Sequence, residues 1–440
     1  MVKVFRFPGG VHPRGAHKSK LPTASKPLER APVSSRLIVP LSQHLGADAE
    51  LAVQKGDKLY MGQLIGRAAG FISANVHSPV SGTVMDIASC MLPSGISVTS
   101  VVIANDRSDT PDPSISGVAD PLALSPDEIR QRIKDAGIVG MGGAVFPTHV
   151  KLALRPGVTV DTLVVNGAEC EPYLTVDHRV MLERAADVIE GARIAAKAVG
   201  AANIVIGVED NKPDAIETLR KAAGSDVTVA SVPEMYPQGG ERQLVYAVTG
   251  RKVPAGKLPA AVRVVVINVA TAAQIALSLR TGMPFIERGI TIGGLVNEPK
   301  NLLARIGSPL VELVRSCGGF KDNARKAVLG GPMMGIALSR LDVPLMKASS
   351  GLIAMDGRDE VEETQCIRCG RCSRACPMCL VPQLIDEYVR ARMTDMAKKC
   401  NVRDCIECGA CTYVCPARRY LTQSCRVGKR MIDMEAKKAT

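Results

Sequence analysis

The sequence predicts a multidomain α/β protein, and three observations support this prediction. Its 440 residues exceed what one hydrophobic core usually organises, so we expect two to four domains. Between residues 125 and 267, runs typical of strands alternate with runs typical of helices, which is the pattern of a mostly parallel sheet. Eleven of the 14 cysteines lie between Cys366 and Cys425, which indicates a separate C-terminal module.

Residues 1–36 are basic and rich in Pro and Gly, and we expect an extended arm that wraps the body. Residues 37–110 contain short apolar runs cut by turns, which predicts a small all-β domain. Segments 53–62 and 78–84 resemble the barrel-sandwich fold of biotinyl and lipoyl carriers. The intervening stretch 68–75 contains no lysine to modify, so we expect a scaffold and not a swinging arm.

The α/β domain is expected at 120–280. Ser125 is a good N-cap for a helix that ends near Gly137 because Pro126 and two acidic residues follow it. Further predicted elements are strands at 162–165, 203–208, 227–232 and 262–267 and helices at 180–199 and 213–223. Residues 286–345 read as a small α+β module, with a β-rich stretch at 289–293 and a helix at 310–316.

The C-terminal cysteines form two copies of one pattern, C-x-x-C-x-x-C-x-x-x-C-P, which is the bacterial ferredoxin run for a [4Fe–4S] cluster. Because the fourth cysteine of each run ligates the other cluster, the pattern predicts two ligand sets. These are Cys366, Cys369, Cys372 and Cys415 for cluster one, and Cys405, Cys408, Cys411 and Cys376 for cluster two. A zinc site rarely uses eight cysteines in this arrangement.

The predicted cluster module covers 360–425, and a basic tail follows at 426–440. Residues 380–399, between the two runs, have apolar side chains at helical spacing, so the module should resemble the α-helical ferredoxin domain of multi-subunit oxidoreductases. Cysteines outside the pattern are expected to be buried or bystander thiols: Cys90, Cys317, Cys379, Cys400 and Cys425.

A glycine-rich segment at 140–151 is the second strong signal. Gly140, Gly142 and Gly143 allow close backbone approach to a phosphate or a flat ring, and Lys151 could neutralise a phosphate. The segment matches neither the dinucleotide-binding fingerprint nor a P-loop. Residues 166–179 follow a predicted strand and place Glu169 and Glu171 around a cysteine, which suggests ligand handling or, equally, a solvated turn.

Together these two segments resemble the flavin site of the NADH-oxidising flavoprotein subunit of complex I, whose pattern is GRGGAGFPTGxKW followed by NADExEPG. Segments 236–241 and 266–269 match that family in the same order. The resemblance implies FMN with NAD(H) stacked on it. The residues it implies for FMN are Gly140, Gly142, Gly143, Lys151, Asn166, Tyr236, Gly239 and Asn268; those implied for NAD(H) are Phe146, Glu171 and Glu241, with Glu169 also in the cofactor-binding segment.

The sequence departs from the flavoprotein pattern at five positions, where Met141, Val145, Ala168, Gly240 and Ile267 replace Arg, Gly, Asp, Glu and Asn. The resemblance implies no catalytic side chain, because hydride passes directly between nicotinamide and flavin and needs only stacking and orientation.

The order of parts along the whole chain resembles the C subunit family of the Rnf complex. That resemblance implies a ubiquitin-like (SLBB) β-grasp module at 286–345. It also implies a peripheral subunit, on the cytoplasmic face of the cell membrane, of a complex that couples ferredoxin–NAD electron transfer to the pumping of Na⁺ or H⁺. Two alternatives are the cobalamin reductase of diol-utilising microcompartments and an electron-wire or scaffold subunit that has lost nicotinamide binding.

Charge and hydropathy agree with this location. No apolar stretch with a cleavage site marks a secretory signal, and the most apolar segment, 264–279, is too short to span a bilayer. Of the net charge of +12, most lies at the two ends, which suggests docking to acidic faces of neighbouring subunits or to anionic lipid. Nucleic-acid binding is disfavoured because aromatics are only 3%.

Overall fold

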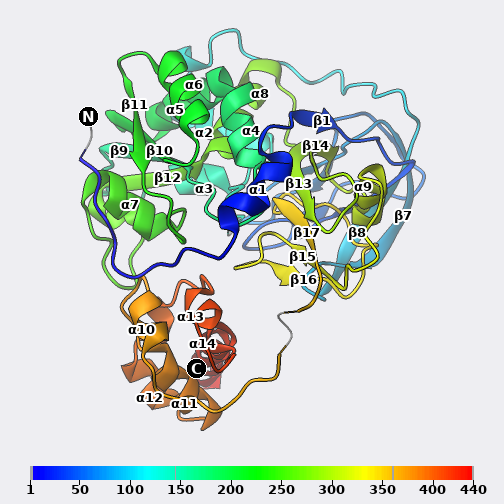
Figure 1. Ribbon diagram of the computed structural model, residues 1–440. Coiled ribbons are helices and arrows are strands. Elements are labelled where there is room, and N and C mark those ends of the chain that lie inside the picture. Colours follow the sequence, from blue (N-terminus) through cyan, green and yellow to red (C-terminus); the bar gives the residue numbers. More distant parts are fainter. Residues whose placement is uncertain (1–2, 144, 359–360, 439–440) are drawn as a thin grey trace.

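The computed structural model describes residues 3–143, 145–358 and 361–438 (Figure 1). The outermost two residues of the predicted arm and of the predicted tail lie outside the described residues, as does residue 360 at the start of the predicted cluster module. The fold class is confirmed: a barrel-sandwich, a parallel α/β domain and a β-grasp sheet pack together, and the C-terminal helices lie below them in Figure 1.

The N-terminal arm is extended only at its beginning. Residues 16–24 form helix α1 (Ala16–Ala24), and β1 (Leu28–Arg30) pairs in parallel with β14 (Lys300–Arg305), so the prediction of an extended arm is wrong for these segments. The sequence hides α1 because the helix has no amphipathic pattern and contains Pro22. Its tertiary contacts hold it, since Lys20 Nζ donates to the Glu169 and Leu174 carbonyls at 2.5 and 3.0 Å. Some basic side chains of the arm remain exposed, and docking through them stays a prediction: Lys3, Arg6, Arg14 and Lys18.

The barrel-sandwich consists of two small antiparallel sheets, ordered β2-β8-β7-β4 and β3-β5-β6. Alternate side chains of the strands, including Leu37, Val39, Ile65 and Ile103, are fully buried between them. The elements are β2 (Arg36–Pro40), β3 (Glu50–Leu51), β4 (Lys58–Leu59), β5 (Leu64–Arg67), β6 (Val76–His77), β7 (Gly82–Met91) and β8 (Ser97–Asn105).

The α/β domain is built on a four-stranded parallel sheet in the order β11-β10-β9-β12. Its strands are β9 (Thr162–Gly167), β10 (Asn203–Glu209), β11 (Val227–Val232) and β12 (Val264–Asn268). Its helices are α2 (Pro126–Asp135), α3 (Thr148–Leu152), α4 (Val176–Glu183), α5 (Ala185–Val199), α6 (Pro213–Ala223), α7 (Glu241–Thr249) and α8 (Val269–Thr281), with short 3-10 turns at Pro121–Ala123 and Pro259–Val262. Ser125 caps α2 with a complete capping box, as predicted.

Two predicted elements of this domain are corrected. The helix expected at 180–199 is two helices, because Arg184, with φ −129° and ψ 32°, leaves the helical region between α4 and α5. The apolar pattern runs across the break and does not show it. The strand expected from residue 262 begins at Val264, since the preceding residues form a 3-10 turn that ends at Arg263 with φ 62°.

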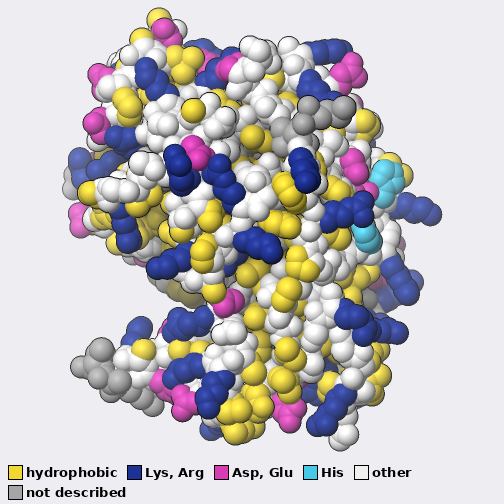
Figure 2. Space-filling view, turned by 90° about the vertical axis from the view of Figure 1, so that its left-hand side faces the viewer, with side chains coloured by type: hydrophobic (Ala, Val, Ile, Leu, Met, Phe, Trp, Pro, Cys, Tyr) yellow, Lys and Arg dark blue, Asp and Glu magenta, His cyan; other side chains and the backbone are white. Residues whose placement is uncertain are grey.

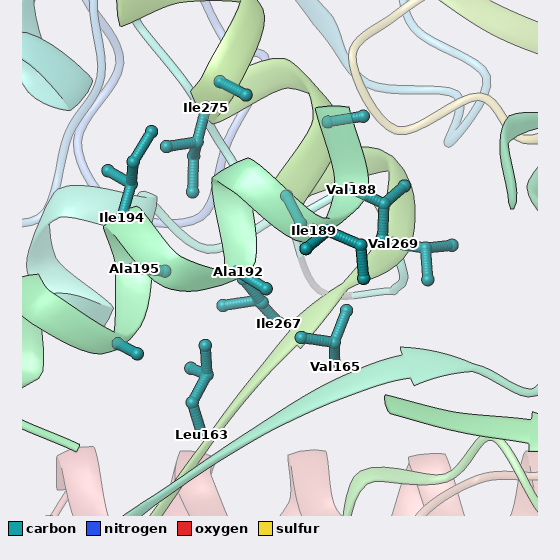
Figure 3. Close-up of a cluster of buried hydrophobic side chains, with 14 of the residues drawn as sticks. Leu163, Val165, Val188, Ile189, Ala192, Ile194, Ala195, Ile267, Val269 and Ile275 are labelled. Atoms are coloured by element: carbon teal, nitrogen blue, oxygen red, sulfur yellow. The ribbon is translucent and has the colours of Figure 1, made fainter. Parts of the chain in front are cut away.

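The main core lies between the sheet and the helices α5 and α8. Figure 3 shows Leu163 and Val165 of β9 below Ile189 and Ala192 of α5, with Val269 of α8 beside them. The two helices approach so closely that a Cβ at Gly191 would lie 1.8 Å from the Ala272 carbonyl oxygen. This packing fixes α8 over the sheet, and α8 begins directly at the carboxyl end of β12.

The β-grasp module is a six-stranded sheet in the order β1-β14-β13-β17-β15-β16. Besides β14 it contains β13 (Glu287–Gly294), α9 (Leu310–Ser316), β15 (Lys326–Leu329), β16 (Ile336–Ala337) and β17 (Gly351–Met355). The predicted span 286–345 is therefore too short, because β17 lies in the middle of the sheet and β1 comes from the N-terminal segment.

The C-terminal module is helical: α10 (Arg371–Ala375), α11 (Pro382–Arg390), α12 (Thr394–Lys399), α13 (Ala410–Tyr413) and α14 (Leu421–Lys438), with a 3-10 turn at Val402–Asp404. The helical stretch predicted at 380–399 is interrupted at Arg392, which has φ 56°. The predicted basic tail is largely part of α14, which contacts α11 and α12 and buries Cys425 and Ile432.

Lys347 joins three parts of the fold. Its side chain is fully buried, and Nζ donates to the carbonyls of Asn75 in the barrel-sandwich and Gly137 in the α/β domain, at 2.8 and 2.7 Å. Burial lowers the pKa of Lys347 to about 7. A neutral amine has two N–H groups, which match these two carbonyls.

The buried lysine predicts a pH-dependent stability. Between pH 7 and the ordinary lysine pKa, the unfolded chain holds a proton at Lys347 that the folded chain lacks, so its contribution to the unfolding free energy rises with pH by up to about 1.4 kcal/mol per unit. The free energy of unfolding is measured in urea at several pH values between 7 and 10. It should rise less steeply with pH in Lys347→Met than in the parent. Equal slopes in the two proteins would contradict this prediction.

Candidate functional site

A pocket opens where the parallel sheet ends, at the carboxyl ends of β9 and β12. In the strand order, β12 and β10 flank β9 on opposite sides, and such a switch point is where open α/β sheets bind ligands. The pocket encloses about 560 Å³, including its open mouth. We call it the glycine-loop pocket; it is lined by Gly140, Gly142, Val145, Phe146, Thr148, Lys151, Asn166, Gly239, Glu241, Val266, Ile267, Asn268 and Thr271.

The glycine loop forms one wall of the pocket. The Gly140 amide donates to the Phe146 carbonyl at 2.9 Å, which closes the loop on itself. A Cβ at Gly142 would lie 3.1 Å from the Cβ of Asn268, so the glycine leaves the space that a ligand needs. Val145 has φ 51°, a left-handed conformation that is strained for a β-branched residue, at a position where the flavoprotein pattern has glycine.

Two asparagines end the strands that flank the pocket. Asn166 Nδ2 donates to the Gly239 carbonyl at 2.8 Å, which ties β9 to the loop before α7. Asn268 caps α8 through Oδ1, and its Nδ2 donates to Asp177 Oδ2 at 2.7 Å. Burial raises the pKa of Asp177, and the hydrogen bond from Asn268 opposes this shift. Asp177 therefore fixes which side of the Asn268 amide faces the pocket.

Polar side chains that line the pocket suit an anionic, flat ligand. Lys151 Nζ lies 2.8 Å from Glu241 Oε1 and 3.0 Å from the Val266 carbonyl oxygen, in a partly exposed pair of small net energy. Thr148 Oγ1 is buried and has no hydrogen-bond partner among the described residues. An unsatisfied hydroxyl and a lysine are groups that bind a flavin phosphate, so the residues fit FMN.

Four predicted site residues are not among those that line this pocket: Gly143 of the glycine loop, and Glu169, Glu171 and Tyr236, whose side chains have other partners. The Glu169 carboxylate accepts the amides of Asp177 and His178 at 2.7 and 3.2 Å, at the start of α4. Glu171 accepts the amides of Met333 and Met334, at 3.0 and 2.9 Å, in the loop between β15 and β16. Burial raises the pKa of Glu171 to about 7. These carboxylates therefore hold the start of α4 and the loop between β15 and β16.

Tyr236 provides the third side chain outside the pocket. Its hydroxyl donates to the Cys408 carbonyl at 2.5 Å, and its backbone pairs with Val11 of the N-terminal arm. The side chain is buried, although Gly239, three residues later, lines the pocket. Tyr236 thus connects the glycine-loop pocket to the cysteine module. Sequence alone offers no signal for this contact, which joins residues far apart in the chain.

Four of the five residues that depart from the flavoprotein pattern have structural roles in this fold. Met141 is buried in the main core, and its amide donates to Thr271 Oγ1 at 3.0 Å. Ala168 is fully buried, and its carbonyl accepts Lys212 Nζ at 2.8 Å. Gly240 is the N-cap of α7, and Ile267 belongs to the core beneath α5.

Each predicted set of four cysteines surrounds its own cavity. The outer cavity is lined by Cys366, Cys369, Cys372 and Cys415, and the inner cavity by Cys376, Cys405, Cys408 and Cys411. Each encloses about 350 Å³, and all 14 cysteines of the chain are free thiols. The four cysteines of each predicted ligand set therefore line one common cavity.

The two cysteine runs also repeat each other in backbone geometry. Arg368 and Glu407, at equivalent positions, have φ of 52° and 56°, and their amides point at the sulfurs of Cys366 and Cys405 at 3.4 Å. Amides directed at thiolate sulfurs are what iron–sulfur sites use to hold and tune a cluster. The residues present fit two [4Fe–4S] clusters.

Cys425 also lines the inner cavity, although its spacing from the second run gave no sign of this. It belongs to α14, and a hydrogen bond from its thiol lowers the pKa of Cys405 to about 7. The expectation that Cys425 is buried is confirmed. Cys425 is also adjacent to Cys405, a predicted ligand.

The inner cavity faces the rest of the molecule. Besides the Tyr236 hydrogen bond to Cys408, the Gly10 amide donates to the Ala375 carbonyl at 3.0 Å. A Cβ at Gly9 would lie 2.7 Å from the Cys376 carbonyl oxygen, so the arm passes directly against the module. The loop that carries Tyr236 and the N-terminal arm therefore pack directly against the cysteine module, between the glycine-loop pocket and the inner cavity.

Four family models match the chain in sequence order. They are the RnfC barrel sandwich hybrid domain at 5–108, the Nuo51 FMN-binding domain at 133–277, the SLBB domain at 290–337 and a 4Fe-4S dicluster domain at 358–416. The FMN-binding match covers the glycine loop and both asparagines, and the dicluster match covers all eight predicted cluster ligands.

Curated relatives match nearly the whole chain. The C subunit of the Na(+)-translocating ferredoxin:NAD(+) oxidoreductase complex of Acetobacterium woodii is 45% identical over 99% of both chains. The chain belongs to the RnfC family. The corresponding RnfC protein of the proton-translocating complex of Clostridium ljungdahlii is 45% identical over 88% of this chain and 84% of that protein. The one from the ion-translocating oxidoreductase complex of Rhodobacter capsulatus is 40% identical over 90% and 78%.

A solved structure shares the fold of this RnfC family member at lower similarity. An NAD+-reducing [NiFe]-hydrogenase in the air-oxidized state superimposes with a TM-score of 0.53 at 19% identity, over 72% of this chain and 64% of the hydrogenase chain. Among the described residues, none of the helices is both long and apolar enough to cross a membrane.

Proposed function

We propose that this RnfC family member binds FMN in the glycine-loop pocket, exchanges electrons with NAD(H) there, and passes them through two [4Fe–4S] clusters. The observation that carries this proposal is the direct contact between the two sites: Tyr236 leaves the pocket loop and hydrogen-bonds Cys408 of the inner cavity. A packed protein contact of this kind suits electron transfer, which needs proximity and no bond chemistry by the protein.

The residues that line the pocket provide binding and orientation. When bound, FMN would link the two-electron hydride chemistry of NAD(H) to the single-electron chemistry of the clusters. Lys151 and Thr148 bind phosphate, and Asn268, fixed by Asp177, faces the ring. Phe146 and Glu241 line the open side, where a nicotinamide would stack. The proposed FMN contacts are Gly140, Gly142, Gly143, Lys151, Asn166, Gly239 and Asn268.

Glu169, Glu171 and Tyr236 act by positioning in this proposal and make no direct cofactor contact. Glu171 holds the loop between β15 and β16 against the α/β domain through two backbone amides. Glu169 holds the start of α4, and α4 carries Asp177. Glu169 thus acts on the pocket through Asp177 and Asn268.

In the cell, we propose a peripheral subunit on the cytoplasmic face of a membrane complex. The support is the family itself, since the relatives are named as subunits of ferredoxin:NAD(+) oxidoreductase complexes that translocate Na⁺, protons or ions. Family membership favours this role over a cobalamin reductase of microcompartments.

NADH-dependent reduction of ferricyanide by the purified chain, with FMN added, tests the proposed function. We expect FMN-dependent turnover, and a rise of about tenfold or more in the FMN dissociation constant of Lys151→Met, because a charge-assisted hydrogen bond to phosphate is lost. Lys257→Met, an exposed lysine away from the pocket lining, is the matched control. Tight FMN binding without NADH turnover would leave only the electron-wire alternative.

A further inference from the structure

The barrel-sandwich contacts the glycine loop at a strained residue. Val145, with φ 51°, lies on the returning half of the loop, which an antiparallel bridge between Val139 and Pro147 closes at its base. The Val145 carbonyl accepts the amide of Leu45 at 3.2 Å, and Leu45 belongs to the loop between β2 and β3. The Leu45 side chain is 56% exposed, so this contact depends on its backbone and not on its side chain.

The loop between β2 and β3 is held in turn by the loop between β5 and β6. The Ala47 amide donates to the Ile72 carbonyl at 2.9 Å, and the Ser73 hydroxyl donates to the Ala47 carbonyl at 2.8 Å. Gly46 has φ 112°, and a Cβ there would lie 2.1 Å from the Ile72 carbonyl oxygen. The two loops are therefore packed backbone against backbone, which fixes the position of the Leu45 amide.

The loop between β5 and β6 also supports the segment that leads into the glycine loop. Ala74 is buried in the main core, and Asn75 Nδ2 donates to the Asp135 carbonyl at 3.3 Å. A Cβ at Gly137, three residues before Gly140, would lie 2.3 Å from the Asn75 carbonyl oxygen. The barrel-sandwich thus contacts the chain both before and after the glycines. Its strands β7 and β8 lie on the right of Figure 1, on the side opposite to the face with many charged side chains that Figure 2 shows.

This support matters because of the residue type at position 145. A β-branched residue at a positive φ is strained, and such a conformation persists only where the surrounding structure enforces it. The flavoprotein pattern has glycine at this position, and glycine adopts a positive φ without steric cost. Val145 lines the pocket and packs against the main core, so a change in its backbone would change the wall against which FMN is proposed to bind.

We propose that the barrel-sandwich is a positioning domain for the flavin site. The Leu45 amide holds the backbone of Val145, and with it the glycine loop, in the conformation that leaves space for FMN. Leu45 is not among the residues that line the pocket, so it acts through Val145. This inference rests on the proposed function, because it takes FMN as the occupant of the pocket. Binding linkage is reciprocal, so FMN must stabilise the Leu45 hydrogen bond by the free energy that this bond contributes to FMN binding.

A double-mutant cycle separates this role from a general effect on stability. Leu45→Pro removes the amide donor, whereas Leu45→Ala keeps it and is the matched control. We expect the FMN dissociation constant, measured by titration calorimetry, to rise about tenfold in Leu45→Pro and to stay within about twofold in Leu45→Ala. With Val145→Gly as the background, Leu45→Pro should change the constant by less than about twofold, because glycine needs no support at this φ.

Hydrogen–deuterium exchange in the full parent chain tests the same contact without a substitution, and it is decisive if Leu45→Pro does not fold. We expect FMN to slow exchange at residues 42–48 by about threefold or more and to leave the tip of the β7–β8 hairpin, residues 91–97, unchanged. Unchanged exchange at 42–48 in a parent that binds FMN, or equal losses of affinity in both backgrounds, would overturn the positioning role alone. A parent that does not bind FMN would overturn the proposed function and the positioning role with it.

Discussion

Replacing Cys411 with alanine is expected to lower the iron content from about eight to about four atoms per chain, because the inner [4Fe–4S] site loses one of its four ligands. The same loss is expected for Cys372→Ala at the outer site. The electron paramagnetic resonance spectrum of the reduced protein should lose a different signal in each variant. FMN binding should persist in both, since neither cysteine lines the glycine-loop pocket.

Cys379→Ala is the matched control for these variants. Cys379 lies three residues after Cys376, is exposed, and lines neither cavity. Its replacement should leave about eight iron atoms and both resonance signals. Iron loss in the control equal to that in Cys411→Ala, or full iron content in Cys411→Ala, would contradict the proposed ligand sets.

The second large effect is expected at the bottom of the flavin pocket. In Asn268→Asp a carboxylate replaces the amide that donates to Asp177, so two buried carboxylates face each other at about the present 2.7 Å. We expect a loss of about 2 kcal/mol or more in stability and an FMN dissociation constant raised at least about tenfold at pH 8. Such a pair shares a proton as the pH falls, so both defects should lessen towards pH 5.

Isothermal titration with FMN and urea unfolding at the two pH values measure these effects. Asn203→Asp is the control, because Asn203 is exposed at the start of β10 and its amide donates only to the Asp161 carbonyl. Asn268→Ala separates loss of the helix cap from repulsion, since it removes the cap without adding charge. An Asn268→Asp protein with the parent's FMN affinity at pH 8 would show that Asp177 does not position this amide.

Features encoded locally could be predicted from the sequence. The glycine loop, Asn166 and Asn268 belong to short motifs at strand ends, and the fold brings strand ends together whatever the connecting lengths. The cysteine spacing likewise predicted which four cysteines lie together at each cavity, because cluster ligation imposes that spacing.

Features created by contacts between distant parts could not be predicted. The role of Tyr236 depends on Cys408, and that of Glu171 on the loop at Met333, each more than 160 residues away. Strand β1 is too short to have its own pattern and forms because β14 offers an open edge. The break at Arg184 interrupts an apolar pattern that itself continues.

The central claim is that NAD(H), the glycine-loop pocket and the two cysteine cavities form one electron path within this chain. Anaerobic titration of the purified protein, containing FMN and iron, with NADH tests it most directly when absorption and paramagnetic resonance spectra are recorded together. The account predicts bleaching of the flavin band and the appearance of reduced [4Fe–4S] signals at the same NADH additions. Two results would contradict it. One is a flavin that stays oxidised after NADH is added. The other is a flavin that bleaches while both clusters stay oxidised, although dithionite can reduce them.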